Sequence, residues 1–200
     1  MSEAYPKSTL AYVLKEEQKF SYADYKAWDL KPGERFELIN GVAYAMSAPN
    51  LTHQHIVAML TSEFFTFLKN KACRVFPAPF DVRLFYEEDE SDDTVVQPDV
   101  VVVCDPQKLS EEGCRGAPDL VVEILSPSNT AIEMERKLNL YKEARVREYW
   151  VVDPKNKHIS VYQWQDSIYL LQTYKVTDIV RPGVLPGMEI PLSAVFANAD

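Results

Sequence analysis

The sequence predicts an α/β or α+β domain in which helices flank a mixed central β-sheet. Two short apolar runs, residues 97–104 and 119–126, are rich in β-branched residues, as buried strands are. Two longer stretches, 52–71 and 130–144, instead repeat their apolar residues with the period of a helix. Strands that alternate with helices are typical of a sheet whose faces are covered by helices.

The start of the chain is predicted to be a lead-in, and the rest to be one domain. Residues 1–20 show no firm periodicity. A length of 200 residues with 46% hydrophobic content suits a single sizeable core, which we expect at residues 21–200. Ser21 is followed three positions later by Asp24, and this spacing of a capping box predicts a short helix over residues 22–30.

Further strands are expected on both sides of the two central runs. Asn40-Gly41 stands between two apolar runs and is a strong signal for a β-hairpin. One helical turn is expected between the two central strands. The hairpin covers residues 35–46, the other predicted strands are 74–86, 148–152, 158–164 and 167–176, and a last short segment lies at 188–192.

Composition and charge narrow the functional classes. No apolar run approaches the ~18–20 residues that span a bilayer, and the N-terminus lacks the features of a signal peptide, so we expect a cytoplasmic protein with no membrane contact. The net charge of −9 argues against broad, high-affinity binding of nucleic acid, although it leaves room for a local basic cleft. The three cysteines have no C-x-x-C spacing, which predicts reduced thiols.

Two acids belong to the central strands. Glu123 lies inside its apolar run and must be paired, protonated or bound to a cation, because burying a bare charge is costly. Asp99, at the entrance of the other run, would approach Glu123 to roughly 5 Å if the two strands pair. Both carboxylates could then reach one Mg²⁺ ion. Asp119 lies four residues before Glu123, about 13 Å along the strand, which is too far to share the ion.

Three further residues are candidates for the same site. Lys137 shares a helix face with apolar residues, and the short preceding loop would bring its ammonium group over the Glu123 strand. Glu37 is either an alternating surface acid of the hairpin or a member of the site. His53, at the start of a helix, either caps and packs there or contacts phosphate and positions water.

Seven motifs occur together in a recognisable order. They are Arg35 to Gly41 (RFELING), His53-Gln54, Asp81 to Leu84 (DVRL), Gln97-Pro98-Asp99, Ala117 to Pro127 (APDLVVEILSP), Lys137-Leu-x-x-Tyr141 and Glu148 to Asp153 (EYWVVD). With these motifs, over roughly residues 20 to 195, the sequence resembles the Uma2 family, which consists of restriction-endonuclease-like proteins of the PD-(D/E)XK nuclease superfamily.

The resemblance implies a restriction-endonuclease-like core and metal-dependent hydrolysis of phosphodiester bonds in nucleic acid, with DNA as the first expectation. Asp99 and Glu123 match the metal-binding acids, and Glu37 matches an early acid that assists them. In the PD-(D/E)XK superfamily a lysine follows the second acid by two residues, but this sequence has Leu125 at that position. We expect Lys137 on the following helix to replace that lysine. Asp99, Glu123 and Glu37 would then bind Mg²⁺ or Mn²⁺, with Lys137 as the catalytic cation.

The expected partners follow from this activity. We expect His53, Ser126 and Tyr141 to contact the nucleic acid. Strands that carry Tyr162, Trp164, Tyr169 and Leu170 make a homodimer a reasonable expectation. Two alternatives remain open at this point, namely a non-catalytic protein of nuclease fold that binds nucleic acid or protein, and an enzyme that hydrolyses a small phosphoester.

Overall fold

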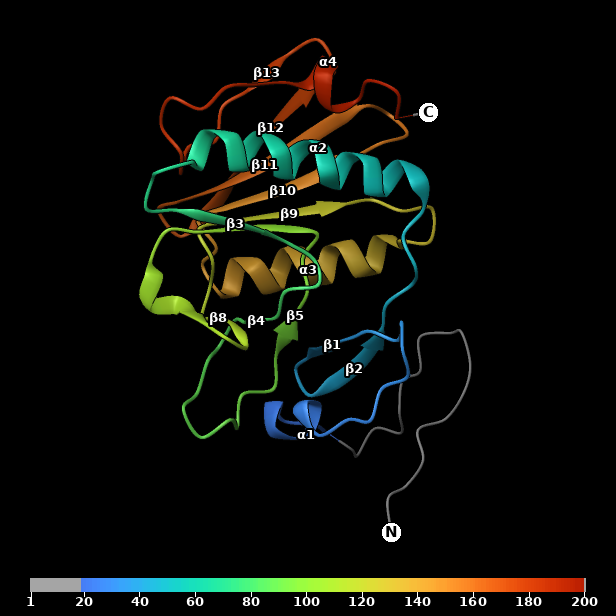
Figure 1. The fold of residues 1–200 in the computed structure, drawn as a ribbon, viewed down its shortest axis with the longest axis vertical. Coiled ribbons are helices and arrows are strands. Elements are labelled where there is room, and N and C mark those ends of the chain that lie inside the picture. Colours follow the sequence, from blue (N-terminus) through green and yellow to red (C-terminus); the bar gives the residue numbers. More distant parts are fainter. Residues whose placement is uncertain (1–18, 200) are drawn as a thin grey trace.

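Two six-stranded β-sheets organise the protein, which is described over residues 19–199 by a computed structural model (Figure 1). The main sheet has the order β12-β11-β10-β9-β6-β3. Within it β9 and β10 are parallel, and the other neighbouring pairs are antiparallel, so the sheet is mixed as predicted. Its strands are β3 (Arg74–Pro77), β6 (Val100–Val103), β9 (Leu120–Ile124), β10 (Glu148–Asp153), β11 (His158–Gln165) and β12 (Ile168–Lys175).

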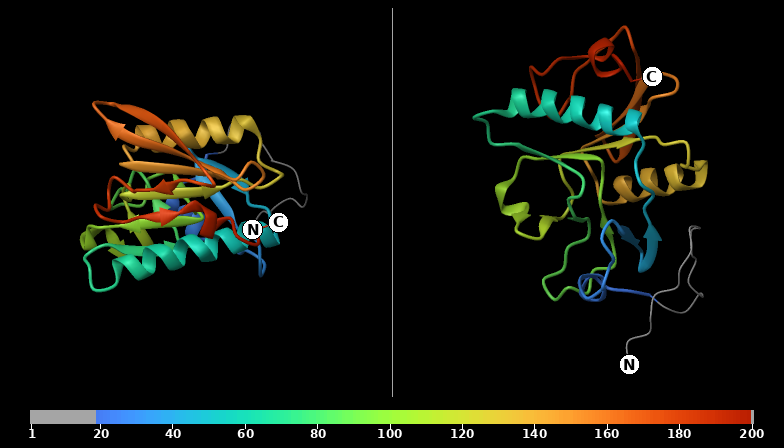
Figure 2. Two further views of the ribbon diagram at one scale, coloured as in Figure 1. Left: turned by 90° about the horizontal axis from the view of Figure 1, so that it is seen from above. Right: turned by 45° about the vertical axis from the view of Figure 1, so that its right-hand side comes forward.

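A helix covers each face of the main sheet (Figure 2). Helix α2 (Leu51–Leu68) buries a stripe of four apolar residues at the expected spacing, namely Ile56, Leu60, Phe64 and Leu68. These residues pack with Val100 and Val122 on one face of the sheet. Helix α3 (Ala131–Glu143) buries Leu140 and Tyr141 with Val101 and Val121 on the other face. Because strand side chains alternate between faces, Glu123 of β9 shares the α3 side with Val121, and it contacts Lys137 of α3.

The second sheet was not predicted from the sequence. Its order is β2-β1-β5-β4-β8-β7, and it lies below α3 in Figure 1. The predicted hairpin is confirmed as β1 and β2, with Asn40 and Gly41 at positive φ values of 51° and 78° in its turn. The strands are β1 (Phe36–Ile39), β2 (Val42–Ala45), β4 (Val82–Arg83), β5 (Val95–Val96), β7 (Leu109–Ser110) and β8 (Gly113–Arg115).

Short elements complete the fold and correct two predicted boundaries. Helix α1 (Tyr22–Lys26) begins at the predicted capping box but ends four residues early. The predicted strand 74–86 is two strands in different sheets, since Pro77 and Pro79 have no N–H to continue one ladder. The remaining elements are η1 (Pro106–Lys108), β13 (Ile179–Val180), β14 (Ile190–Pro191) and α4 (Leu192–Val195).

Most of the predicted lead-in, residues 1–18, lies outside the described residues. Across residues 19–199, no helix is both long and apolar enough to cross a membrane. The expectation of three reduced cysteines was wrong. Cys73 and Cys104 are the next pair beyond Arg74 and Val103, where the β3–β6 ladder ends, and their sulfur atoms form a disulfide of 2.09 Å. Cys114 is the free thiol.

The burial of Cys114 gives a direct test of this assignment. Its side chain is 1% exposed, and burial raises the pKa of the thiol to about 12. Without reductant at pH 8, we expect iodoacetamide to leave the native protein unmodified and to label one thiol per chain after unfolding, measured by mass spectrometry. Labelling of three thiols would show that Cys73 and Cys104 are not bonded.

Candidate active site

The register of the central strands brings Asp99 and Glu123 together. Val100 of β6 pairs with Val122 of β9, so the next step of this antiparallel ladder sets Asp99 opposite Glu123. The Glu123 side chain contacts Lys137 and Tyr141 of α3, the Asp99 side chain contacts His53 of α2, and the two side chains are 10% and 14% exposed. The pair predicted from the sequence therefore lies at one end of the main sheet, buried but still reached by solvent.

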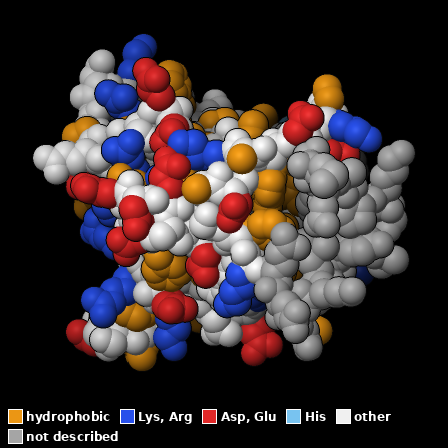
Figure 3. All heavy atoms as spheres, turned by 90° about the horizontal axis from the view of Figure 1, so that it is seen from below, with side chains coloured by type: hydrophobic (Ala, Val, Ile, Leu, Met, Phe, Trp, Pro, Cys, Tyr) orange, Lys and Arg blue, Asp and Glu red, His pale blue; other side chains and the backbone are white. Residues whose placement is uncertain are grey.

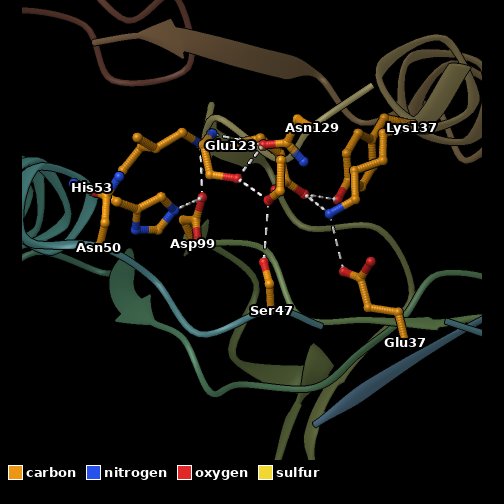
Figure 4. Close-up of polar contacts among 12 residues, drawn as sticks. Glu37, Ser47, Asn50, His53, Asp99, Glu123, Asn129 and Lys137 are labelled. Atoms are coloured by element: carbon orange, nitrogen blue, oxygen red, sulfur yellow. Dashed lines mark hydrogen bonds and ion pairs between the residues drawn. The ribbon is translucent and has the colours of Figure 1, made fainter. Parts of the chain in front are cut away.

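Lys137 connects these acids to the second sheet (Figure 4). Its Nζ donates to Glu123 Oε1 at 2.8 Å and to Glu37 Oε1 at 3.2 Å. Lys137 is in the middle of α3, and Glu37 is in β1, so the ammonium group links a helix and both sheets. The lysine side chain is 17% exposed. The helical phase of the sequence had predicted this inward direction.

The charges in this cluster depend strongly on one another. Burial raises the pKa of Glu123 to about 7, with Lys137 lowering it and the acids Asp99 and Glu37 raising it further. Burial by itself lowers the pKa of Lys137, but the neighbouring carboxylates of Glu123 and Glu37 outweigh it and raise the pKa above its usual value. Lys137 is therefore a permanent cation at neutral pH.

Tyr141 holds Glu123 from the next turn of α3. Its hydroxyl donates to Glu123 Oε1 at 2.6 Å, and its side chain is fully buried. Burial, followed by the charge of Glu123, raises the pKa of Tyr141 well above its usual value, so it remains a donor. We had expected a substrate contact at this position. In the structure the hydroxyl is bound to Glu123, and a contact of Tyr141 with substrate stays a prediction.

Among the described residues, Asp99 is held through one oxygen, Oδ2. Its Oδ2 accepts from the backbone N–H of Ile124 at 2.7 Å and lies 3.1 Å from His53 Nε2. His53 is in the first turn of α2, where the side chain of Asn50 accepts from its backbone N–H at 2.8 Å. No residue of the described range donates a hydrogen bond to Asp99 Oδ1 or to Glu123 Oε2.

Gln97 is a site residue that the sequence reasoning missed. Its backbone N–H donates to Glu37 Oε1 at 3.0 Å, beside the Lys137 contact to the same oxygen. Its side-chain amide donates to Asp81 Oδ1 at 2.8 Å and to Tyr25 at 3.2 Å. Asp81 thus holds the Gln97 side chain and has no hydrogen bond with Glu37, Asp99 or Glu123 among the described residues. The position of Gln97 directly before Pro98-Asp99 was the available signal.

Ser126 lies in the loop between β9 and α3, among other polar side chains. Figure 4 shows Ser47 and Asn129 near the acids. The Ser126 Oγ is 2.8 Å from Ser128 Oγ and donates to Asn129 Oδ1 at 3.1 Å. Ser47, which follows the β1–β2 hairpin, approaches Ser128 to 3.4 Å between the hydroxyl oxygens. The loop and the hairpin therefore meet at the edge of the site. The contact of Ser126 with substrate stays a prediction.

The donor atoms of the site suit a hard cation. The open atoms are carboxylate oxygens of Asp99 and Glu123, and oxygen is the ligand that Mg²⁺ and Mn²⁺ prefer. Within residues 19–199, no three His, Cys, Asp or Glu side chains are grouped closely enough to form a complete metal site. An ion held here would need water or a substrate phosphate to complete its shell, as Mg²⁺ commonly does.

The family of the chain follows from its match to a family model. The model of the Uma2 family, described as "putative restriction endonuclease", matches residues 22–193, which is most of the chain. The chain belongs to the Uma2 family. This confirms the resemblance seen in the motifs. The matched residues include Glu37, Asp99, Glu123 and Lys137.

Two individual proteins support the same assignment. An uncharacterized protein of Synechocystis sp. is 27% identical over 162 residues, which cover 80% of this chain and 83% of that protein. A crystal structure from Anabaena variabilis, described as "a putative nuclease belonging to DUF820", has a TM-score of 0.70 at 18% identity. That match covers 90% of this chain and 99% of the other, and it confirms that the Uma2 protein has the mixed, helix-flanked sheet of a nuclease fold.

Proposed function

We propose that the protein is a metal-dependent endonuclease that hydrolyses phosphodiester bonds of nucleic acid, with DNA as its substrate. The observation that carries the proposal is the contact of 2.8 Å between Lys137 Nζ and Glu123 Oε1 next to the strand end that bears Asp99. Two acids and a lysine at one point suit hydrolysis of a phosphate ester. Membership of the Uma2 family supports the same class of reaction.

Each residue has a proposed task. Asp99 and Glu123 would hold the Mg²⁺ or Mn²⁺ ion through their open oxygens. Such an ion, when bound, polarises the scissile phosphate and lowers the pKa of a water molecule. Lys137 would orient the attacking water and stabilise the negative charge that develops on the phosphate. Glu37 holds the lysine through Oε1, so any contact of Glu37 with the metal would use Oε2.

Cleavage of supercoiled plasmid DNA tests the proposal. We expect nicking and linearisation with Mg²⁺ or Mn²⁺, none with EDTA, and a loss of activity in Asp99→Ala and Glu123→Ala. Single-stranded DNA and RNA in parallel assays identify the polymer. If no nucleic acid is cut with either ion, or if both variants cut as fast as the wild type, the enzyme proposal is wrong.

A second candidate is a non-catalytic nuclease-fold protein that binds nucleic acid or a partner protein. The net charge of −9 favours a partner protein over nucleic acid as the ligand in this alternative, because phosphate binding depends on Lys and Arg. The face in Figure 3 carries acidic and basic side chains intermixed over its described part. Calorimetric titration with Mn²⁺ separates the candidates, since only the enzyme requires a bound ion. A small phosphoester substrate would instead give cleavage of nitrophenyl phosphates without DNA binding.

We also propose that the protein acts in the cytoplasm as a homodimer. Strand β12 forms one edge of the main sheet and exposes Ile168, Leu170 and Leu171 by 51%, 45% and 57%. An apolar edge of this kind favours pairing with a second copy. We expect Leu171→Lys to convert a dimer to a monomer in light scattering coupled to size exclusion. A wild-type monomer, or a variant that stays dimeric, would contradict this surface.

A further inference from the structure

We infer that His53 is a positioning residue that fixes the orientation of the Asp99 carboxylate, an inference that rests on the proposed function. Asp99 Oδ2 accepts a hydrogen bond from the backbone N–H of Ile124 at 2.7 Å and lies 3.1 Å from His53 Nε2. Two partners from different elements therefore hold this one oxygen. Rotation of the carboxylate would break both contacts, so together they fix its orientation.

The surroundings of His53 define which ring nitrogen carries the proton. The residue is 8% exposed, and its Nδ1 is buried without a hydrogen-bond partner among residues 19–199. A proton on Nδ1 would leave a buried donor unpaired and would set the Nε2 lone pair against a carboxylate oxygen. The proton on Nε2 instead makes a hydrogen bond to Asp99. His53 is thus a donor to Asp99 through Nε2.

This assignment changes the role that the sequence suggested for His53. We had expected it to contact phosphate or to position water. Nε2 is engaged by Asp99, and Nδ1 is buried, so neither nitrogen is free for substrate or for proton transfer. His53 acts on the reaction through Asp99, as partners behind a metal ligand do when they fix its orientation.

The position of His53 is itself defined by the fold. Asn50 accepts from its backbone N–H at the start of α2, and Ile56 anchors the next turn in the core. Helix α2 covers the face of the sheet opposite to α3. Each acid is therefore held from a different helix, Asp99 by His53 of α2 and Glu123 by Lys137 of α3 (Figure 4).

Metal affinity measures the effect of this contact. In calorimetric titrations with Mn²⁺, we expect His53→Ala to weaken binding by about 10–100-fold, the usual loss when a partner behind a metal ligand is removed. His53→Gln keeps an N–H donor near the position of Nε2 and should restore most of the affinity. His55→Ala is the matched control on the same helix, because His55 Nε2 lies 2.7 Å from the Ala197 carbonyl oxygen, away from the site.

A second measurement is independent of metal. Nitrogen NMR of the imidazole rings in the metal-free protein should show His53 protonated on Nε2, with a changed signal in Asp99→Ala. If the wild type binds no Mn²⁺ but shows this tautomer, the proposed function fails while the positioning of Asp99 stands. A ring protonated on Nδ1, or a His53→Ala variant that binds Mn²⁺ as tightly as the wild type, overturns the inference.

Discussion

Replacing Lys137 with methionine should reduce the rate of DNA cleavage by about 10²–10³-fold, the usual loss when a charge-stabilising donor is removed from an active site. Methionine keeps the length and apolar stem of the side chain but removes the ammonium group that lies 2.8 Å from Glu123 and 3.2 Å from Glu37. Single-turnover cleavage of a labelled duplex measures the chemical step. The loss should therefore appear in kcat and not in KM.

The same variant should bind Mn²⁺ at least as tightly as the wild type, because it removes a cation from beside the metal-binding acids. This combination distinguishes a catalytic lysine from a residue that only holds the site together. Lys142→Met is the matched control, since Lys142 is an exposed residue of the same helix. If Lys137→Met cleaves DNA as fast as Lys142→Met, Lys137 has no catalytic role.

Replacing Asp92 with alanine should lower the free energy of unfolding by about 3–5 kcal/mol, as expected when one partner of a buried ion pair is removed. The side chain of Asp92 is fully buried, and Arg83 binds it through Nε at 2.9 Å and also through Nη2. The Arg83 guanidinium lies 3.8 Å from the ring centre of Tyr22 and 4.4 Å from that of Tyr86. Without Asp92, this buried cation loses its ion-pair partner.

Urea unfolding followed by circular dichroism measures the change. Glu88→Ala is the control, because Glu88 is an exposed acid of the same loop and should leave stability unchanged. Six of the seven residues 87–93 are acidic, a composition typical of a solvated loop. Asp92 is the exception that ties this loop to β4. Equal midpoints for Asp92→Ala and Glu88→Ala would show that the pair does not contribute to stability.

The parts of the site that the sequence predicted depend on regular geometry. Asp99 and Glu123 come together because their strands pair in an antiparallel register, which sets the two residues opposite each other. Lys137 points inward because its position on α3 follows from the 3.6-residue period. Both conclusions need only local periodicity and one assumed strand pairing. The family resemblance added Glu37, which local pattern alone left open.

The parts that were missed depend on packing between distant segments. Strands β4 and β5 have two residues each, which is too short for any periodic signal, so the second sheet could not be recognised. Cys73 and Cys104 are 31 residues apart and meet only through the β3–β6 register. Gln97 and Glu37 are 60 residues apart in the sequence. The donor is the backbone N–H of Gln97, a group that every residue except proline has, so no residue type signals the contact.

The central claim is that Asp99 and Glu123 bind one divalent ion beside Lys137. A crystal structure of the protein soaked in Mn²⁺ tests it most directly through the anomalous signal of the metal. We predict a peak between Asp99 Oδ1 and Glu123 Oε2, within the ~2.0–2.6 Å of each oxygen that such ions require. The absence of a peak between these carboxylates at saturating Mn²⁺, or a peak only at other residues, would contradict the account.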